Sequence, residues 1–455
     1  MTVSGSSLGD RAAAGSAAVS RLVATLRRRG RIQAIVQVMA VRVIALVANL
    51  ATGMISAAIL GPAGRGVQAA LMVGPQFIGG VSEFGLHGSV IYNAKVEPRF
   101  EGEYLGCALL LGLATGLVGM TFGWLLAPMW LHKYSADTIV TARWMLTIVP
   151  LGVVMHVLIA GLEGRGEFGL ANRLMLSASV VTLVALGVLT GLGRLTPATA
   201  AASYLFSTVP IFIAMGWHVR RIIRPTATLR TRLVRRLLHY GMRFYGVDLF
   251  GALGDYVDQI IVVLLLDPRS LGIYAVAVSA SRVLSVISTS VSTVLFPAMA
   301  ARSSGDIAEI VGVAARVTSV IAAAAAVALA LVGPFLLHTL YGEKFDSAVE
   351  PFRWLLVDSV VSNFVWIFYQ VFAAAGRAEI VTGLEAVGLS VSALSMLVLV
   401  PRYGTTGAAI SLLVASTVRL ACMLGCFRLI MRLPMPRLIL SRSDLAHVMR
   451  RSPGL

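Results

Sequence analysis

Residues 104–130 read YLGCALLLGLATGLVGMTFGWLLAPMW, a run in which no side chain carries a charge. As an α-helix, a run of this length crosses the roughly 30 Å hydrocarbon core of a bilayer. Its small and aliphatic residues are the kind that pack helix against helix in lipid. A membrane-spanning strand would instead alternate apolar and polar residues over about 10 positions. The run therefore predicts a membrane helix and argues against a barrel.

The rest of the chain has the same character. Of its 455 residues, 57% are hydrophobic and 13% are charged, whereas about a quarter of the residues in an ordinary soluble domain are charged. Apolar windows long enough to span a membrane recur throughout, separated by short turns rich in Gly and Pro. We expect an all-α integral membrane protein with about twelve transmembrane helices, near residues 33–58, 67–92, 104–130, 138–161, 170–191, 197–218, 238–266, 271–298, 310–338, 351–375, 380–400 and 405–430.

Basic residues give the chain a formal charge of +17. Most of them fall in the two tails and in the loops that an even number of spans places on the same side of the membrane. Because cytoplasmic loops carry the excess of Lys and Arg, we expect both termini in the cytoplasm. The charge predicts anionic membrane lipids as partners rather than nucleic acid. No cleavable signal is seen ahead of the RRRGR run at 27–31, so the first apolar segment is expected to remain a membrane helix.

The longest predicted cytoplasmic segment, 219–237, holds seven Arg residues between the sixth and seventh windows. We interpret it as a basic linker that lies on anionic headgroups between two halves of the molecule. The predicted domains are then an N-terminal tail, an N-terminal lobe, this linker, a C-terminal lobe and a C-terminal tail, at 1–32, 33–218, 219–237, 238–430 and 431–455.

Short matches at a nearly constant spacing indicate that the two halves are repeats. Pro62, Gly66 and Ala69 correspond to Pro268, Gly272 and Ala275; the other pairs are Arg143-Trp144 with Arg353-Trp354, Gly164-Arg165 and Glu167 with Gly376-Arg377 and Glu379, and Ala200-Ala201 and Ser203 with Ala408-Ala409 and Ser411. An even number of spans per repeat keeps both halves in the same orientation. We therefore predict two six-helix lobes related by a pseudo-two-fold axis along the membrane normal, with a transport cavity between them.

Two stretches carry a resemblance to a known family, AAILGPAGRGVQAALMVGPQFIGGVSEFGLHGSVI at 57–91 and DYVDQIIVVLLLDPRSLGIYAVAVSASRVLSVISTSVSTVLFPAMA at 255–300. The chain resembles the oligosaccharide flippases, or polysaccharide biosynthesis membrane proteins, of the MOP exporter superfamily, which also includes MATE antiporters and the lipid II flippase. The resemblance implies a MATE-like fold whose cavity is lined mainly by the first two spans of each lobe.

The same resemblance implies a function. A member of the family would move undecaprenyl-pyrophosphate-linked oligosaccharide from the inner to the outer leaflet of the bacterial cytoplasmic membrane. The product would serve assembly of O-antigen, capsule or exopolysaccharide, with a polysaccharide polymerase and export machinery as partners.

Ionisable residues at membrane depth are costly and are functional candidates. Arg42 in the first span and Arg282 in the eighth fall in the spans that should line the cavity. Guanidinium groups offer bidentate hydrogen bonds to phosphate oxygens, so we hypothesise that both bind the pyrophosphate. The alternatives are that Arg42 snorkels to the inner headgroups and that Arg282 forms a structural ion pair with Asp258.

Carboxyl groups in the same spans form a second set. Asp248, Asp255 and Asp258 in the seventh span are seven and three residues apart, which places them on one helical face. We expect ion pairs with nearby arginines, with a coupling cation or proton as the alternative. Glu83 in the second span is the remaining acidic candidate and is expected to pair with Arg42.

Polar residues in the tenth and eleventh spans are candidate sugar contacts: Asp358, Asn363, Gln370 and Glu385. The alternative is polar contact between helices, which is the commoner role of such residues in membranes. His156 stands alone in an apolar stretch and is expected to be packed there rather than to relay protons.

No pattern in the sequence predicts a metal, a cofactor or a catalytic site. The three cysteines lie in apolar runs, and GPAGRG at 61–66 lacks the Lys-Ser/Thr of a P-loop. No outer loop is long enough to carry catalytic groups, so we do not expect an enzyme. The main alternative is a MATE-like proton- or sodium-coupled drug or metabolite antiporter. Against it, the first span has no carboxylate, and Arg42 would repel a cationic drug. The chain is expected to act as a monomer.

Overall fold

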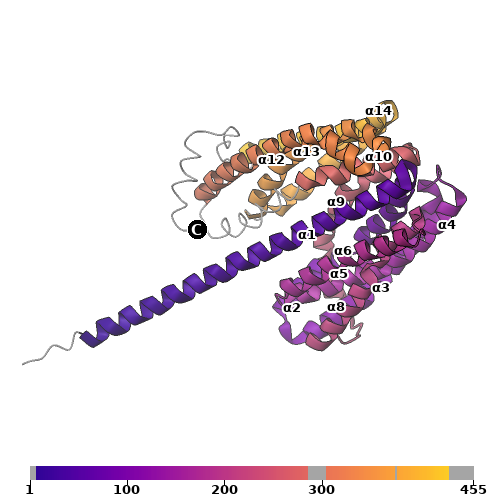
Figure 1. The fold of residues 1–455 in the computed structure, drawn as a ribbon. Coiled ribbons are helices and arrows are strands. Elements are labelled where there is room, and N and C mark those ends of the chain that lie inside the picture. The colour runs from indigo at the N-terminus through magenta and orange to yellow at the C-terminus, as the bar shows by residue number, and fades with distance from the viewer. Residues whose placement is uncertain (1–6, 285–303, 375–376, 430–455) are drawn as a thin grey trace, which may run out of the picture.

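The computed structural model describes residues 7–284, 304–374 and 377–429. It describes side chains from Ile44 onward except at residues 304–317 and at a few single positions that include Asp248 and Gln370. Apart from short 3-10 turns, these ranges form α-helices that gather into two lobes (Figure 1). The predicted all-α fold is confirmed.

The N-terminal lobe contains the helices before residue 223. They are α1 (Ser7–Val81), α2 (Leu86–Val96), α3 (Glu101–Trp130), α4 (Ala136–Met145), α5 (Val149–Gly164), α6 (Phe168–Gly191), α7 (Pro197–Phe206) and α8 (Thr208–Ile222), with 3-10 turns η1 (Pro98–Phe100) and η2 (Leu146–Ile148).

The C-terminal lobe begins within the predicted linker, of which only residues 223–230 lie outside helices. Its elements are α9 (Thr231–Leu265), α10 (Pro268–Ser281), η3 (Arg282–Leu284), α12 (Ser304–Tyr341), η4 (Glu343–Ala348), α13 (Val349–Ala374) and α14 (Ala378–Leu429).

Two of the long helices fold back on themselves at a glycine. In α1 the fold lies at Gly61, which has φ 66° and is followed by Pro62; in α14 it lies at Gly404, with φ 58°. Glycine adopts such positive φ values without the steric cost that a side chain brings. The described residues contain 7 helical segments long and apolar enough to cross a membrane, and two of these contain the folds at Gly61 and Gly404. The count of twelve spans stays a prediction.

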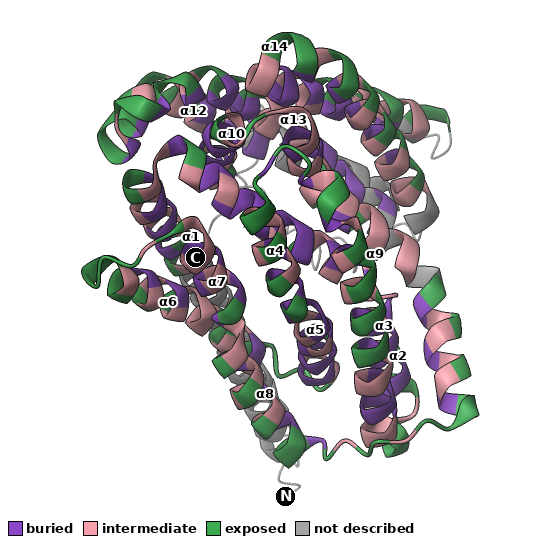
Figure 2. Cartoon of the chain, turned by 90° about the vertical axis from the view of Figure 1, so that its right-hand side faces the viewer, coloured by how far each residue is buried: buried purple, intermediate pink, exposed green. Residues whose placement is uncertain are grey.

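The outward faces of both lobes are apolar. Large hydrophobic side chains stand exposed there, for example Leu331 at 76%, Val118 at 70% and Phe335 at 69%. Figure 2 shows these exposed faces around interiors that are buried. A monomeric protein in water does not expose so much apolar surface. The chain is a multi-pass membrane protein, and the exposed faces contact lipid.

The lobes share one hydrophobic core at one end and have separate cores at the other. The shared core joins Leu71 and Leu205 of the N-terminal lobe to Tyr274 and Phe352 of the C-terminal lobe. Toward the opposite end, the N-terminal lobe has a core of its own from α2, α3, α5 and α8, and the C-terminal lobe has another from α13 and α14. The shared core holds the two lobes together at its own end of the molecule.

Gly66 and Gly272 meet where the cores join. A Cβ placed on Gly66 would lie 1.6 Å from the carbonyl oxygen of Pro268, and one on Gly272 would lie 1.9 Å from that of Pro62. The contact is reciprocal, as a two-fold axis requires. These are the residues that the sequence repeat paired. Another repeat pair agrees, because the hydroxyls of Ser203 and Ser411 each donate to the carbonyl four residues earlier in a buried helix.

The first half of α9 belongs to the N-terminal lobe by packing, although its second half packs against α14. Leu233 and Leu237 are buried in the N-terminal core. The guanidinium of Arg236 donates hydrogen bonds to the carboxylate of Glu97 and to the hydroxyl of Tyr104. Arg236 and Tyr104 hold the pKa of Glu97 below its ordinary value. Helix α9 thus joins the two lobes beyond their shared core.

Candidate functional site

A central cavity of about 320 Å³ lies between the lobes, beside the shared core. Both halves of α1 line it, and α7, α9, α10 and η3 complete the wall: Leu46, Asn49, Leu50, Arg65, Ala69, Met72, Val73, Gln76, Tyr204, Tyr256, Gln259, Ala275, Val278, Ser279 and Arg282. Most of these residues come from the spans that the sequence predicted to line it, the first two of each lobe. Polar and apolar side chains both contribute to the wall.

Arg65 is a cavity cation that sequence reasoning missed. The predicted spans at 33–58 and 67–92 leave Arg65 in the loop between them, but Gly61 ends the preceding helix and Pro62 begins the next, so Arg65 falls in the first turns of a membrane helix. Proline at the first helical position is a known start signal, and it could have placed Arg65 correctly. The residue is 8% exposed, and among the described residues its Nε has no hydrogen-bond partner. A buried guanidinium nitrogen of this kind is suited to an anionic oxygen.

Arg282 lines the same cavity from the turn η3, as predicted from the sequence. Its charge also acts on the carboxyl groups of Asp255 and Asp258 in the neighbouring α9. Phosphate binding by Arg282 and its ion pair with Asp258 both stay predictions. The same guanidinium faces the cavity and lies within the field of two carboxylates.

Arg42 lies in α1, but its side chain is outside the described part of the structure. Helical spacing places position 42 on the same face of α1 as Leu46 and Asn49, four and seven residues later, and both of these line the cavity. A cavity role for Arg42 stays a prediction.

A second cavity of about 260 Å³ enters the N-terminal lobe and shares Gln76, Tyr204 and Tyr256 with the central one. Glu83 and His156 lie in its wall. The imidazole of His156 is hydrogen-bonded to the Glu83 carboxylate, where the sequence had suggested an isolated, packed histidine. The predicted pair of Glu83 with Arg42 stays a prediction, because the side chain of Arg42 is not described. Within the described ranges, no three His, Cys, Asp or Glu residues group as metal ligands.

Neither Asp255 nor Asp258 of α9 lines these two cavities. Tyr256 and Gln259 line them, each one position after an aspartate. Asp258 is 5% exposed and accepts a hydrogen bond of 2.8 Å from the hydroxyl of Tyr274, while Asp255 is exposed. The side chain of Asp248 is not described.

Of the predicted sugar contacts, the three whose side chains are described line neither cavity: Asp358, Asn363 and Glu385. Glu385 pairs with Arg419 at 2.9 Å, and the amide of Asn363 donates to Ser319 at 3.4 Å. Asp358 lies 3.5 Å from the hydroxyl of Ser362. The contacts of Glu385 and Asn363 are those of the alternative, polar contact between helices, whereas the contact between Asp358 and Ser362 lies within α13. The side chain of Gln370 is not described.

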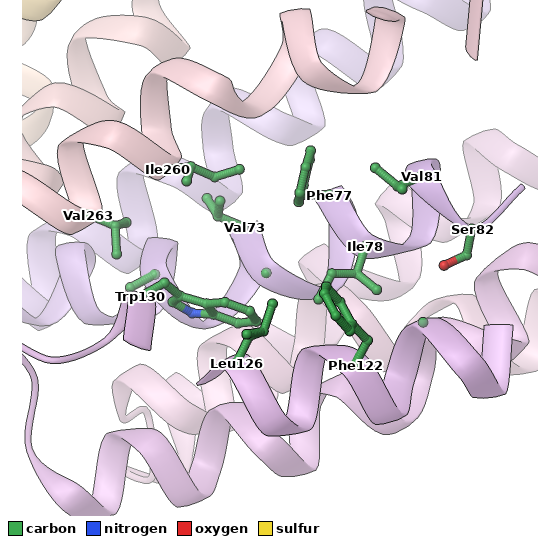
Figure 3. A pocket seen from close by; sticks show the side chains of 13 residues that line it. Val73, Phe77, Ile78, Val81, Ser82, Phe122, Leu126, Trp130, Ile260 and Val263 are labelled. Atoms are coloured by element: carbon green, nitrogen blue, oxygen red, sulfur yellow. The ribbon is translucent and has the colours of Figure 1, made fainter. Parts of the chain in front are cut away.

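An apolar pocket of about 180 Å³ lies on another side of the second half of α1, against α3 and α9 (Figure 3). Val73 lines both this pocket and the central cavity. Phe77, Phe122 and Trp130 dominate its wall, and among the described residues that line it Ser82 contributes a hydroxyl. Such a surface suits hydrocarbon and offers nothing to a phosphate. The central cavity is therefore the better candidate for an anionic head group.

Comparison with known proteins agrees with this architecture. Residues 55–350 match the family model described as "Polysaccharide biosynthesis protein". No curated protein matches the chain. A lipid II flippase, MurJ, in an inward closed conformation shares the fold with a TM-score of 0.74 at 14% identity, over 86% of this chain and 87% of that one.

Two transporters of the MOP superfamily are also similar in structure. An inward-facing multidrug resistance MATE family transporter has a TM-score of 0.70 at 14% identity, covering 90% of this chain and 96% of that one. A transporter from Pyrococcus furiosus has a TM-score of 0.60 at 16% identity, covering 86% and 93%. The matched model extends over more than half of the sequence, and the fold is that of the superfamily. The chain therefore belongs to the polysaccharide biosynthesis protein family.

Proposed function

We propose that this protein is a flippase that carries undecaprenyl-pyrophosphate-linked oligosaccharide from the inner to the outer leaflet of the bacterial cytoplasmic membrane. The product would feed O-antigen, capsule or exopolysaccharide assembly. The observation that supports the proposal best is the pair of guanidinium groups, Arg65 and Arg282, in one cavity between the lobes.

The substrate class follows from the charge of that cavity. A diphosphate carries several negative charges that must lose water inside the membrane, and fixed cations compensate for that loss. Guanidinium groups do so with directed hydrogen bonds. At about 320 Å³ the cavity suits a head group rather than a whole oligosaccharide, so the lobes must separate further to pass the sugar. We infer alternating access by a monomer without catalysis, with both termini in the cytoplasm.

The test is deletion of the gene in its host, followed by labelling of the glycolipid with a membrane-impermeant lectin on oriented vesicles. The proposal expects glycolipid to accumulate on the inner leaflet and the wild-type gene to restore its export. Unimpaired export in the deletion strain would overturn it.

A second candidate, a proton-coupled antiporter of drugs or metabolites, gains support from one observation. Glu83 places a carboxylate in a cavity of the N-terminal lobe, although the first span contains none. Altered drug sensitivity in the deletion strain with normal glycolipid export would favour this candidate.

A further inference from the structure

The pair Glu83 and His156 lies at a break between two helices. Helix α1 ends at Val81 and α2 begins at Leu86, so Glu83 belongs to the turn between them. The turn contains two residues with positive φ, Phe84 at 49° and Gly85 at 68°. Its local backbone hydrogen bonds include that from the amide of Leu86 to the carbonyl of Glu83 at 3.0 Å. A turn of this kind changes direction more easily than an intact helix does.

This break is also a contact between α2 and α9. A Cβ on Gly85 would lie 2.1 Å from the carbonyl oxygen of Gly241, so the two backbones touch. The ring of Phe84 stacks on that of Tyr245 with centroids 4.7 Å apart. Because α9 continues into the C-terminal lobe, any change at the break is transmitted to the relative position of the lobes.

A proton bound by Glu83 and His156 sets the net charge of this pair. The Glu83 side chain is 15% exposed and that of His156 is 47% exposed, into a cavity that adjoins the central one. With the imidazole protonated, the two groups form an ion pair without net charge. When the proton leaves His156 for water in the cavity, a largely buried carboxylate remains beside a neutral ring, and such a charge is costly. Histidine makes this change between about pH 5 and 8.

Few other charged or titratable groups face this pair from the described side chains. Tyr204 from α7 and Tyr256 from α9 line the same cavity, and both are uncharged near neutral pH. Asp255 precedes Tyr256 in α9 but does not line this cavity. Arg42 lies earlier in α1, and its side chain is not described.

We propose that Glu83 and His156 form the proton-binding site that couples transport to the proton gradient. The protonated pair stabilises the turn against α9, and loss of its proton loosens that contact so that the lobes move apart at this end. This inference names the coupling ion of the transport proposed above and rests on that proposal.

The matched control is a second histidine–glutamate pair between the same two helical regions. His87 in α2 and Glu163 in α5 lie 3.1 Å apart, and neither residue lines the two cavities. The variants are therefore Glu83→Gln and His156→Gln, with His87→Gln as control. Each is made in a cysteine-free chain that carries spin labels at Lys95→Cys and Arg428→Cys, one on each lobe.

The first measurement is the distance between the labels from pH 5 to pH 8, without substrate. We expect longer distances at high pH in the wild type and in His87→Gln, and distances independent of pH in Glu83→Gln and His156→Gln. A pH-independent wild type, or an unchanged response in both cavity variants, would overturn the inference. A label distance that is independent of pH in the wild type would overturn the inference even if a variant fails to fold.

The second measurement is transport of a polyprenyl diphosphate bearing a fluorescent disaccharide in proteoliposomes. One pH unit across the membrane should shift its distribution by up to about tenfold per proton exchanged. Transport that does not depend on the pH gradient would contradict the proton site but would not contradict the proposed flippase function. Failure to move the probe, with the pH-dependent distance intact and lost in the cavity variants, would support the proton site and count against the lipid substrate.

Discussion

Gly66 of the N-terminal lobe and Gly272 of the C-terminal lobe pack backbone against backbone, each in contact with the proline that precedes the other by four residues. No side chain fits between them. The contact closes the end of the molecule where the two lobes share a core, and the central cavity begins beside it. Opening the transporter at this end therefore means separating these two glycines.

Substitution of Gly66 by Ala should separate the lobes at this end, because the added methyl would lie 1.6 Å from the carbonyl of Pro268. We expect a loss of stability of about 1–3 kcal/mol, as for other overpacked sites, together with a wider separation of the helix ends. Spin labels on α4 and η4 would measure it. Gly187→Ala is the control, since a Cβ there meets no atom within 4 Å. An unchanged distance between the labels in Gly66→Ala would show that the contact between Gly66 and Gly272 does not set the separation of the lobes at this end.

Loss of either cavity guanidinium should impair export of an anionic substrate. For Arg65→Ala and Arg282→Ala we expect initial rates about tenfold lower or worse, since a hydrogen bond to a charged group contributes roughly 1.5–3 kcal/mol. Lysine at either position should restore part of the rate, because it keeps the charge and loses the bidentate geometry. The assay is transport in proteoliposomes, with the exposed Arg194→Ala as control. Equal transport rates in all these variants would contradict the proposal that Arg65 and Arg282 bind phosphate in the cavity.

The ion pair between Glu385 and Arg419 should act on stability rather than on the substrate. Removing one partner in Arg419→Met leaves a partly buried carboxylate, which we expect to cost about 1–3 kcal/mol after allowance for its exposure. The double variant Glu385→Gln with Arg419→Met should recover part of that loss. Thermal unfolding followed by tryptophan fluorescence measures both variants. A change in glycan preference at unchanged stability would instead support the predicted sugar contact.

Acid should weaken the attachment of α9 to the N-terminal lobe. The pKa of Glu97 is lowered in the folded protein by Arg236 and Tyr104, so its contribution to stability is present above the unfolded value of about 4.3 and is lost as pH falls through the lower folded value. Unfolding temperatures between pH 7 and pH 3 should therefore fall less steeply in Glu97→Gln than in the wild type. Glu343→Gln, an exposed carboxylate of η4, should follow the wild type. Parallel curves for all three proteins would refute the assignment.

Much of the fold could be predicted from the sequence, because the length of each apolar window and the spacing of the repeat each reflect a physical constraint on the chain. Apolar windows must be helices in lipid, and the repeat that paired Gly66 with Gly272 reports the symmetry of the lobes. The gaps between the predicted windows at 59–66 and at 401–404 contain Gly61 and Gly404, where the chain folds back.

The site was predictable only in part, since side-chain partners depend on packing between distant segments. His156 and Glu83 are 73 residues apart, and nothing local to either predicts their contact. For Asp255 and Asp258, the spacing gives a shared helical face but not the direction in which that face turns. Arg65 was misplaced by a few residues at a helix start, which is where boundaries are hardest to assign.

Helix α9 has a consequence for how the chain can be divided. Its first half is embedded in the N-terminal core through Leu233 and Leu237, while the polypeptide before it, residues 223–230, is a surface loop. A gene split within this loop would produce two fragments. The second fragment would begin with α9, whose first half packs into the core of the first fragment. Co-expressed fragments should therefore find each other and reconstitute an active transporter, whereas a split after Leu237 would remove that recognition element from the C-terminal fragment.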